Sequence, residues 1–202
     1  MLKIKELIKL AKLEFQEWLY PIYRKRNELL LRAAHASEQL TSANVKAVRE
    51  IADKLKHLGD PEGGFYGISR IASHPQLVPN SELGQELMAL VLKYASVFRD
   101  KNPELYFENI FAASLNVRLG TPLELQAVAA TEDAFLAFFK LDPARAVERL
   151  GAATPYVVLG SALGDKLQQL LDPSSRAELV KEKSMRSGGV RQPTRGHGQD
   201  PS

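Results

Sequence analysis

The side chains of this 202-residue chain best suited to chemistry are basic ones near its start. Four of them fall within nine residues: Arg24, Lys25, Arg26 and Arg32. Guanidinium and ammonium groups neutralise phosphates, and Tyr20 and Tyr23 offer rings on which a base can stack. The stretch therefore predicts contact with a nucleic-acid backbone. The alternative is a solvated helix face, in which Glu28 pairs with Arg24 four residues before it.

A second basic group lies at the C-terminal end, among glycines in "SGG" and "RGHG". Its members are Arg186, Arg191 and Arg195. Flexible segments rich in Arg and Gly bind nucleic acids through phosphate attraction and stacking, so these residues are a second candidate for nucleic-acid binding. The alternative is a solvated end without a function.

The third candidate is "GGFYGISRIAS", which joins three glycines to two aromatic residues and Arg70. Glycines let a ligand approach the backbone closely, and Arg70 supplies a cation. No Gly-Lys-Ser/Thr follows, so the segment is not a phosphate-binding P-loop. The alternative is a structural loop whose aromatic side chains fill the core.

Catalytic and metal-binding patterns are missing. The histidines are scattered, and no pair has ligand spacing with a carboxylate. Glu132 and Asp133 are adjacent, so on a helix they point about 100° apart and do not form an acid–base pair. We therefore expect no catalytic residue, no metal and no cofactor, and we predict that the protein is not an enzyme.

Composition indicates a globular protein with basic ends. Apolar residues make up 45% of the chain, and no apolar run approaches the length of a membrane span. The absence of cysteine favours the cytoplasm and excludes disulfides. Residues 1–60 carry a net charge of +4, residues 61–140 carry −3, residues 141–180 carry −1 and residues 181–202 carry +3. This distribution suits an anionic partner at the ends.

Apolar spacing of three and four residues predicts helices throughout. The first helix reaches Pro21, which ends it, kinks it or opens a second helix over residues 22–39. A third helix is expected over residues 45–58, capped by Thr41, Ser42 or Asn44. The Gly- and Pro-rich segment from Gly59 then predicts a loop with a short helix over 66–73, and a hinge at 59–80.

Later helices are predicted by a capping residue followed by proline, a pattern that occurs at residues 102, 121, 142, 154 and 172. They are expected over 81–99, 103–118, 122–140, 143–150, 155–170 and 173–183, with Gly160 and Gly164 inside one of them. Thr121 and Glu124 predict a capping box, with Glu124 reaching the Thr121 amide. No unit repeats at a fixed length. We therefore predict an all-α, irregular bundle of about eight helices over 1–183 and a disordered basic tail over 184–202.

One segment, "EGGFYGISRIASHPQ", resembles the small helical subunit of CRISPR type I-A effector complexes, which act in antiviral defence. The resemblance covers fifteen residues. It implies an α-helical subunit of an RNA-guided complex that holds nucleic-acid backbone through basic side chains. Only Arg70 carries over from that family.

Two classes of function remain. The first is a non-catalytic subunit of a nucleoprotein assembly that binds RNA or DNA backbone without sequence specificity, together with other protein subunits and away from membranes. The second is a protein-interaction or structural module, such as an adaptor, scaffold or virion component. In the second class the apolar faces of the first two helices, including Trp18, Leu30 and Leu31, dock onto another chain.

Overall fold

The computed structural model describes the backbone of residues 4–188 and the side chains of residues 20–181. These residues form α-helices and two short 3-10 helices, with no strand among them. The all-α prediction is confirmed, with nine α-helices over the described residues in place of about eight. The elements are α1 (Ile4–Ala36), α2 (Ser42–His57), α3 (Pro61–Ala72), α4 (Glu82–Tyr94), η1 (Ala95–Phe98), α5 (Pro103–Ser114), α6 (Pro122–Leu141), α7 (Pro143–Ala153), η2 (Thr154–Tyr156), α8 (Ala162–Leu171) and α9 (Pro173–Gly188).

Four helices begin at capping residues spaced 40 positions apart, at 41, 81, 121 and 161. In α2, α4, α6 and α8 a Thr or Ser hydroxyl accepts a hydrogen bond from the backbone N–H three residues later. Each hydroxyl satisfies one of the amides that a helix leaves unpaired at its start. The chain therefore restarts a helix in the same way at a constant interval.

The partner helix of each pair begins at Asp or Asn followed by proline. In α3, α5, α7 and α9 the side chain of residue 60, 102, 142 or 172 accepts a hydrogen bond from the amide three residues on. Proline suits the first helical position because its missing N–H would have no partner there. The result is four helical hairpins, α2/α3, α4/α5, α6/α7 and α8/α9.

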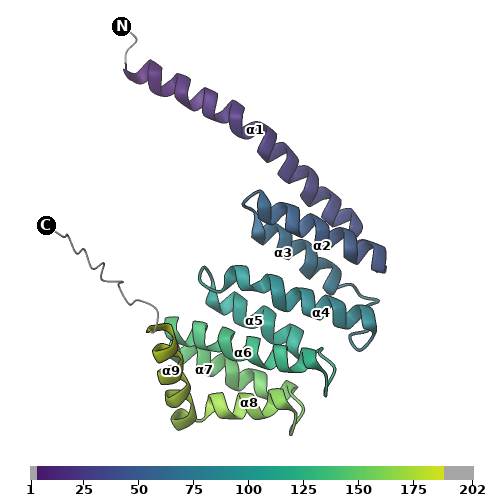
Figure 1. The fold of residues 1–202 in the computed structure, drawn as a ribbon, viewed down its shortest axis with the longest axis vertical. Coiled ribbons are helices and arrows are strands. Elements are labelled where there is room, and N and C mark those ends of the chain that lie inside the picture. Colours follow the sequence, from purple (N-terminus) through teal and green to yellow (C-terminus); the bar gives the residue numbers. More distant parts are fainter. Residues whose placement is uncertain (1–3, 189–202) are drawn as a thin grey trace, which may run out of the picture.

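The hairpins stack along the long axis of the molecule, with α1 beside the first of them (Figure 1). Each helix packs on those one or two places away in the sequence, as in repeat proteins. The prediction of an irregular bundle without a fixed-length unit is therefore corrected. The repeat is easily missed because a cap needs only an oxygen acceptor, so Thr replaces Ser and Asp replaces Asn.

Connections between the helices fall into two sets at opposite edges of the stack. The connections inside the hairpins lie at one edge, and the loops between hairpins, residues 73–80, 115–120 and 157–160, lie at the other (Figure 1). We call these the turn edge and the loop edge. Among the described helices, none combines the length of a membrane span with the apolar composition that a span requires.

The long helix α1 corrects the predicted division at Pro21. Its backbone is helical from Ile4 to Ala36, with Pro21 inside it, in place of separate helices before and after the proline. Pro21 removes one hydrogen bond, but 33 residues of helix provide enough others to continue past it. The second half of α1 lies beside the first hairpin, and the helix runs beyond the stack in its first half (Figure 1).

The Gly-rich segment after Gly59 is helical over most of its length, which corrects the predicted loop with a helix at 66–73. Asp60 caps α3 and Pro61 opens it. A Cβ at Gly64 would lie 2.9 Å from the carbonyl oxygen of Ala52, so the glycine lets α3 approach the backbone of α2. Phe65 is buried in the core, as the structural alternative predicted, but Tyr66 is 56% exposed, so that alternative holds for one of its two aromatic side chains. The hinge at 59–80 stays a prediction.

Two further details differ from the expectations. Gly160 lies in the loop before α8 with φ of +76°, and Gly164 lies in the first turn of that helix, so the predicted helix over 155–170 is in fact η2, a loop and α8. The carboxylate of Glu124 accepts the N–H of Gly120 at 2.6 Å, and not that of Thr121. The predicted tail overlaps α9 as far as Gly188, and its remaining residues lie outside those described.

Close contact between α2 and α3 gives a first prediction. Gly64→Ala should lower the free energy of unfolding by about 1–3 kcal/mol, because the added methyl group meets backbone atoms that side-chain rotation cannot move. Gly151→Ala in α7 is the matched control. Nothing lies within 4 Å of its added Cβ, so this change should raise the free energy by about 0.5–1 kcal/mol. Urea unfolding followed by circular dichroism measures both, and equal effects of the two changes would contradict the packing.

Tyr94 joins the first two hairpins and gives a second prediction. Its buried hydroxyl donates to Asp53. Burial, and then this hydrogen bond, raise the pKa of Tyr94 to about 12, against about 10 in an unfolded chain. The native state therefore favours the neutral phenol, and the stability that this provides is complete below about pH 10 and lost as the pH rises to about 12. The urea midpoint of Tyr94→Phe should fall less steeply than that of the wild type in this window. Parallel curves would contradict the assignment.

Candidate nucleic-acid interface

A basic groove lies between α1 and the end of α2. It is an open cavity of about 390 Å³, lined by Lys25, Glu28, Leu29, Arg32, Lys54, His57 and Leu58. α1 contributes residues one and two turns apart on one face, and α2 contributes its last turn. The groove thus collects three fixed cations, one histidine and one carboxylate on an apolar floor.

The floor of the groove is part of a small hydrophobic cluster that holds α1 to α2. Leu29 is only 4% exposed and packs with Ile51 and Leu55, while Leu58 is half-buried beside them. Because this cluster fixes the two helices against each other, the cations on either side of it belong to a defined surface.

Elsewhere in the stack, several cations form ion pairs with carboxylates of neighbouring elements. These pairs are Arg99 with Asp133, Lys101 with Glu62, Arg145 and Arg149 with Glu104, and Lys166 with Glu132. In contrast, Lys25, Arg32 and Lys54 form no ion pair with any side chain between residues 20 and 181, and the same holds for Glu28. The groove therefore carries three cations and one carboxylate that form no ion pair with the described side chains.

Arg26 has a different role from its neighbours in the basic run. Its Nε donates to Asp60 Oδ2 at 2.6 Å, and the same carboxylate caps α3. The hydrogen bond and the negative charge of Asp60 raise the pKa of Arg26. Arg26 therefore ties α1 to the start of α3, and it does not line the groove.

A purely structural role explains only part of the groove. Lys54 and His57 lie in the last turn of α2, where positive charge offsets the negative end of the helix dipole. Lys25 is in the middle of α1, far from either helix end, and no dipole accounts for it. An anion bound in the groove would use the cations of both helices together.

The other predicted residues are dispersed. Arg24, Tyr20 and Tyr23 are exposed on α1 outside the groove lining, and no ion pair joins Arg24 to Glu28. Arg70 is exposed in the last turn of α3, also outside the groove. Among the predicted interaction residues, Leu30 is half-buried against the α1–α2 cluster and Leu31 is 64% exposed. The side chains of Trp18, Arg186, Arg191 and Arg195 lie outside those described.

Sequence reasoning missed Lys54 and His57. A signal was present, because α2 ends in "DKLKH", but basic residues in a last turn are typical of any helix. Only the packing of α1 on α2 shows that these two residues face Lys25 and Arg32.

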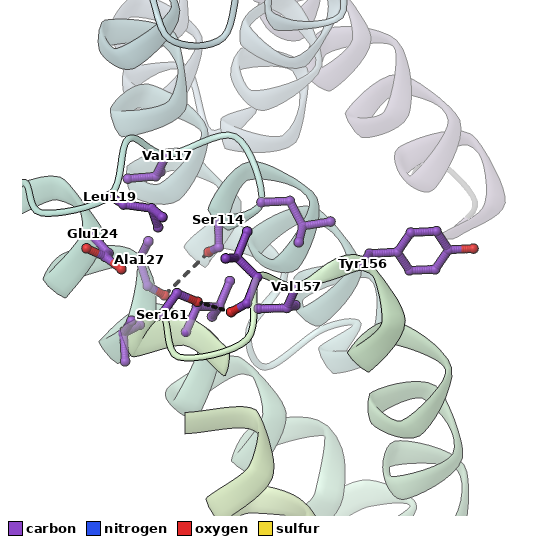
Figure 2. A pocket seen from close by; sticks show the side chains of 12 residues that line it. Ser114, Val117, Leu119, Glu124, Ala127, Tyr156, Val157 and Ser161 are labelled. Atoms are coloured by element: carbon purple, nitrogen blue, oxygen red, sulfur yellow. Dashed lines mark hydrogen bonds between the residues drawn. The ribbon is translucent and has the colours of Figure 1, made fainter. Parts of the chain in front are cut away.

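A second, small cavity of about 40 Å³ lies at the loop edge, between the loops that precede α6 and α8. Figure 2 shows its polar groups bonded to nearby backbone: Ser114 donates to Ala127 and Ser161 donates to Val158. Tyr156 points away from the cavity and is 74% exposed (Figure 2). Its serine hydroxyls are engaged in the fold, and its carboxylate, Glu124, accepts the Gly120 N–H, so these groups serve the structure of the loops.

No metal site emerges, since no three His, Asp or Glu side chains gather in ligand geometry within the described part of the chain. Comparison with protein-family models, with characterised proteins and with solved structures finds no match to this chain. The groove is therefore interpreted from its own geometry and charge.

The neighbouring residues Lys25 and Arg26 give a third prediction. Arg26→Ala should lower the urea midpoint, because it leaves the half-buried Asp60 without its cation and removes one contact between α1 and α3. Lys25→Ala should leave the midpoint unchanged, since Lys25 makes no ion pair in the described structure. Circular dichroism during urea unfolding measures both variants. A loss of stability in Lys25→Ala equal to that in Arg26→Ala would contradict this division of roles.

Proposed function

We propose that this protein is a non-catalytic helical subunit of a nucleoprotein assembly, which binds the backbone of RNA or DNA in the groove between α1 and α2. The observation that carries the proposal is the gathering of Lys25, Arg32 and Lys54 in one open groove, without ion pairs to the described side chains. Unpaired, exposed cations are the groups that displace counterions from phosphates.

Binding of this kind is independent of sequence. Ammonium and guanidinium groups contact phosphates, which are the same in every nucleotide, and flexible lysine side chains adapt to the spacing of the phosphates. Base-specific contacts need several polar side chains arranged against base edges. The groove offers only Glu28 and His57 besides its cations, which supports backbone recognition.

The loop edge supports the second part of the proposal, contact with other protein subunits. Exposed apolar side chains recur in its three loops and next to them, and include Val78, Leu119, Leu125, Tyr156, Val158 and Leu159. Apolar side chains that gather on an exposed surface often belong to a protein–protein interface. A stack that binds nucleic acid on one edge and protein on the other would act as a scaffold. We also propose a cytoplasmic location, because the sequence has no cysteine. The resemblance at residues 62–76 suggests an RNA-guided complex as one such assembly.

Salt dependence provides the fourth prediction. A labelled oligonucleotide titrated with the full chain should show an anisotropy increase whose dissociation constant rises steeply with salt. Lys25→Ala and Lys54→Ala should each weaken binding, and each should reduce the slope of log affinity against log salt by roughly 1, since one phosphate contact is lost.

Lys140→Ala is the matched control, because this exposed lysine of α6 lies outside the groove. It should bind like the wild type. A dissociation constant that does not depend on salt, or groove variants that bind as tightly as Lys140→Ala, would overturn the proposal. A chain that ends at Lys183 tests in the same titration whether Arg186, Arg191 and Arg195 add to the affinity.

A further inference from the structure

We propose that the groove selects single-stranded nucleic acid, holding one unpaired nucleotide with its phosphates on the cations and its base against the apolar floor. This inference rests on the proposed function and names the class of nucleic acid that the same site takes.

The floor of the groove is the first reason. Leu58 is half-buried, and it lines the groove together with Leu29, so the cations of α1 and α2 border an apolar surface open to solvent. A phosphate is strongly hydrated and gains nothing from contact with leucine side chains. The flat face of a base gains by leaving water for such a surface, and this gain does not depend on which base is present.

The carboxylate of Glu28 is the second reason. It lies among the groove residues without a cation paired to it among residues 20–181. In a site for phosphate alone, its negative charge would only repel the ligand. A base, however, carries N–H donors on its edge, and a carboxylate accepts hydrogen bonds from them. Glu28 therefore suits a ligand that is anionic at one end and a hydrogen-bond donor at the other.

The shape of the site excludes a duplex from the same contacts. The volume of the groove, about 390 Å³, falls in the range of small-molecule pockets, which take compact ligands such as one nucleotide. In a duplex the bases are stacked and paired, so only phosphates are available to a groove of this size. A duplex would reach the cations at the rim and leave Leu58 uncovered.

The test compares three labelled probes of equal length with the full chain at one salt concentration: a single strand, the corresponding duplex, and a strand that has sugars and phosphates but no bases. The single strand should bind roughly tenfold more tightly than the other two, because burying one face of a base against an apolar surface has an effect of about that size. Leu58→Asn should bring single-strand affinity close to that of the strand without bases, and it should keep the dependence on salt.

The possible results separate this inference from the proposal on which it depends. If all three probes bind equally and with the same dependence on salt, or if the duplex binds best, single-strand selection is wrong while backbone binding stands. If none of the probes binds, the proposed function fails. If Leu58→Asn loses its helical circular dichroism, the affinities of the single strand and of the strand without bases for the unmodified protein still test whether the groove contacts a base.

Discussion

Every hairpin of this protein can bury its apolar face only against the hairpins beside it, and the remaining features follow from that constraint. Side-chain caps restart a helix at a 40-residue interval and proline opens the returning helix, so the chain turns back at regular places. Contacts stay between near neighbours in sequence, as expected for a repeat architecture. The stack then needs a covering helix at its start, and α1 provides it through Leu29 and the ion pair from Arg26 to Asp60.

The covering position of α1 explains why the groove occurs where it does. Inside the stack a cation can meet a carboxylate of the next hairpin, as Arg99, which follows η1, meets Asp133 of α6. At the end of the stack, α1 has the first hairpin on one side only. Lys25 and Arg32 therefore face the last turn of α2, which is itself basic, and the one carboxylate of the groove, Glu28, forms no ion pair with them. The positive charge of these groove residues therefore remains available to a ligand.

Much of the fold was predictable from local signals. Capping residues, prolines and three-to-four spacing depend on neighbours within a few residues, and they indicated the helices from α4 to α7 with small errors at their ends. The predictions were wrong where contacts between residues far apart in the sequence outweighed a local preference. Gly63, Gly64 and Gly67 favour a loop locally, but they form a close helix contact because Ala52 and Ala33 lie opposite two of them. Pro21 favours a break, but the helix continues on both sides of it.

The sequence by itself determined that the described chain is helical and that its basic residues gather near the ends, because both depend only on residue type and spacing. Tertiary structure alone decided how those residues are used. Two adjacent residues of one basic run have different surroundings. Arg26 is bound to Asp60, whereas Lys25 lines a groove together with Lys54, which is distant in sequence. The reason is physical: successive residues of a helix point about 100° apart, so the packing of the neighbouring helices determines which cation meets a carboxylate and which meets solvent.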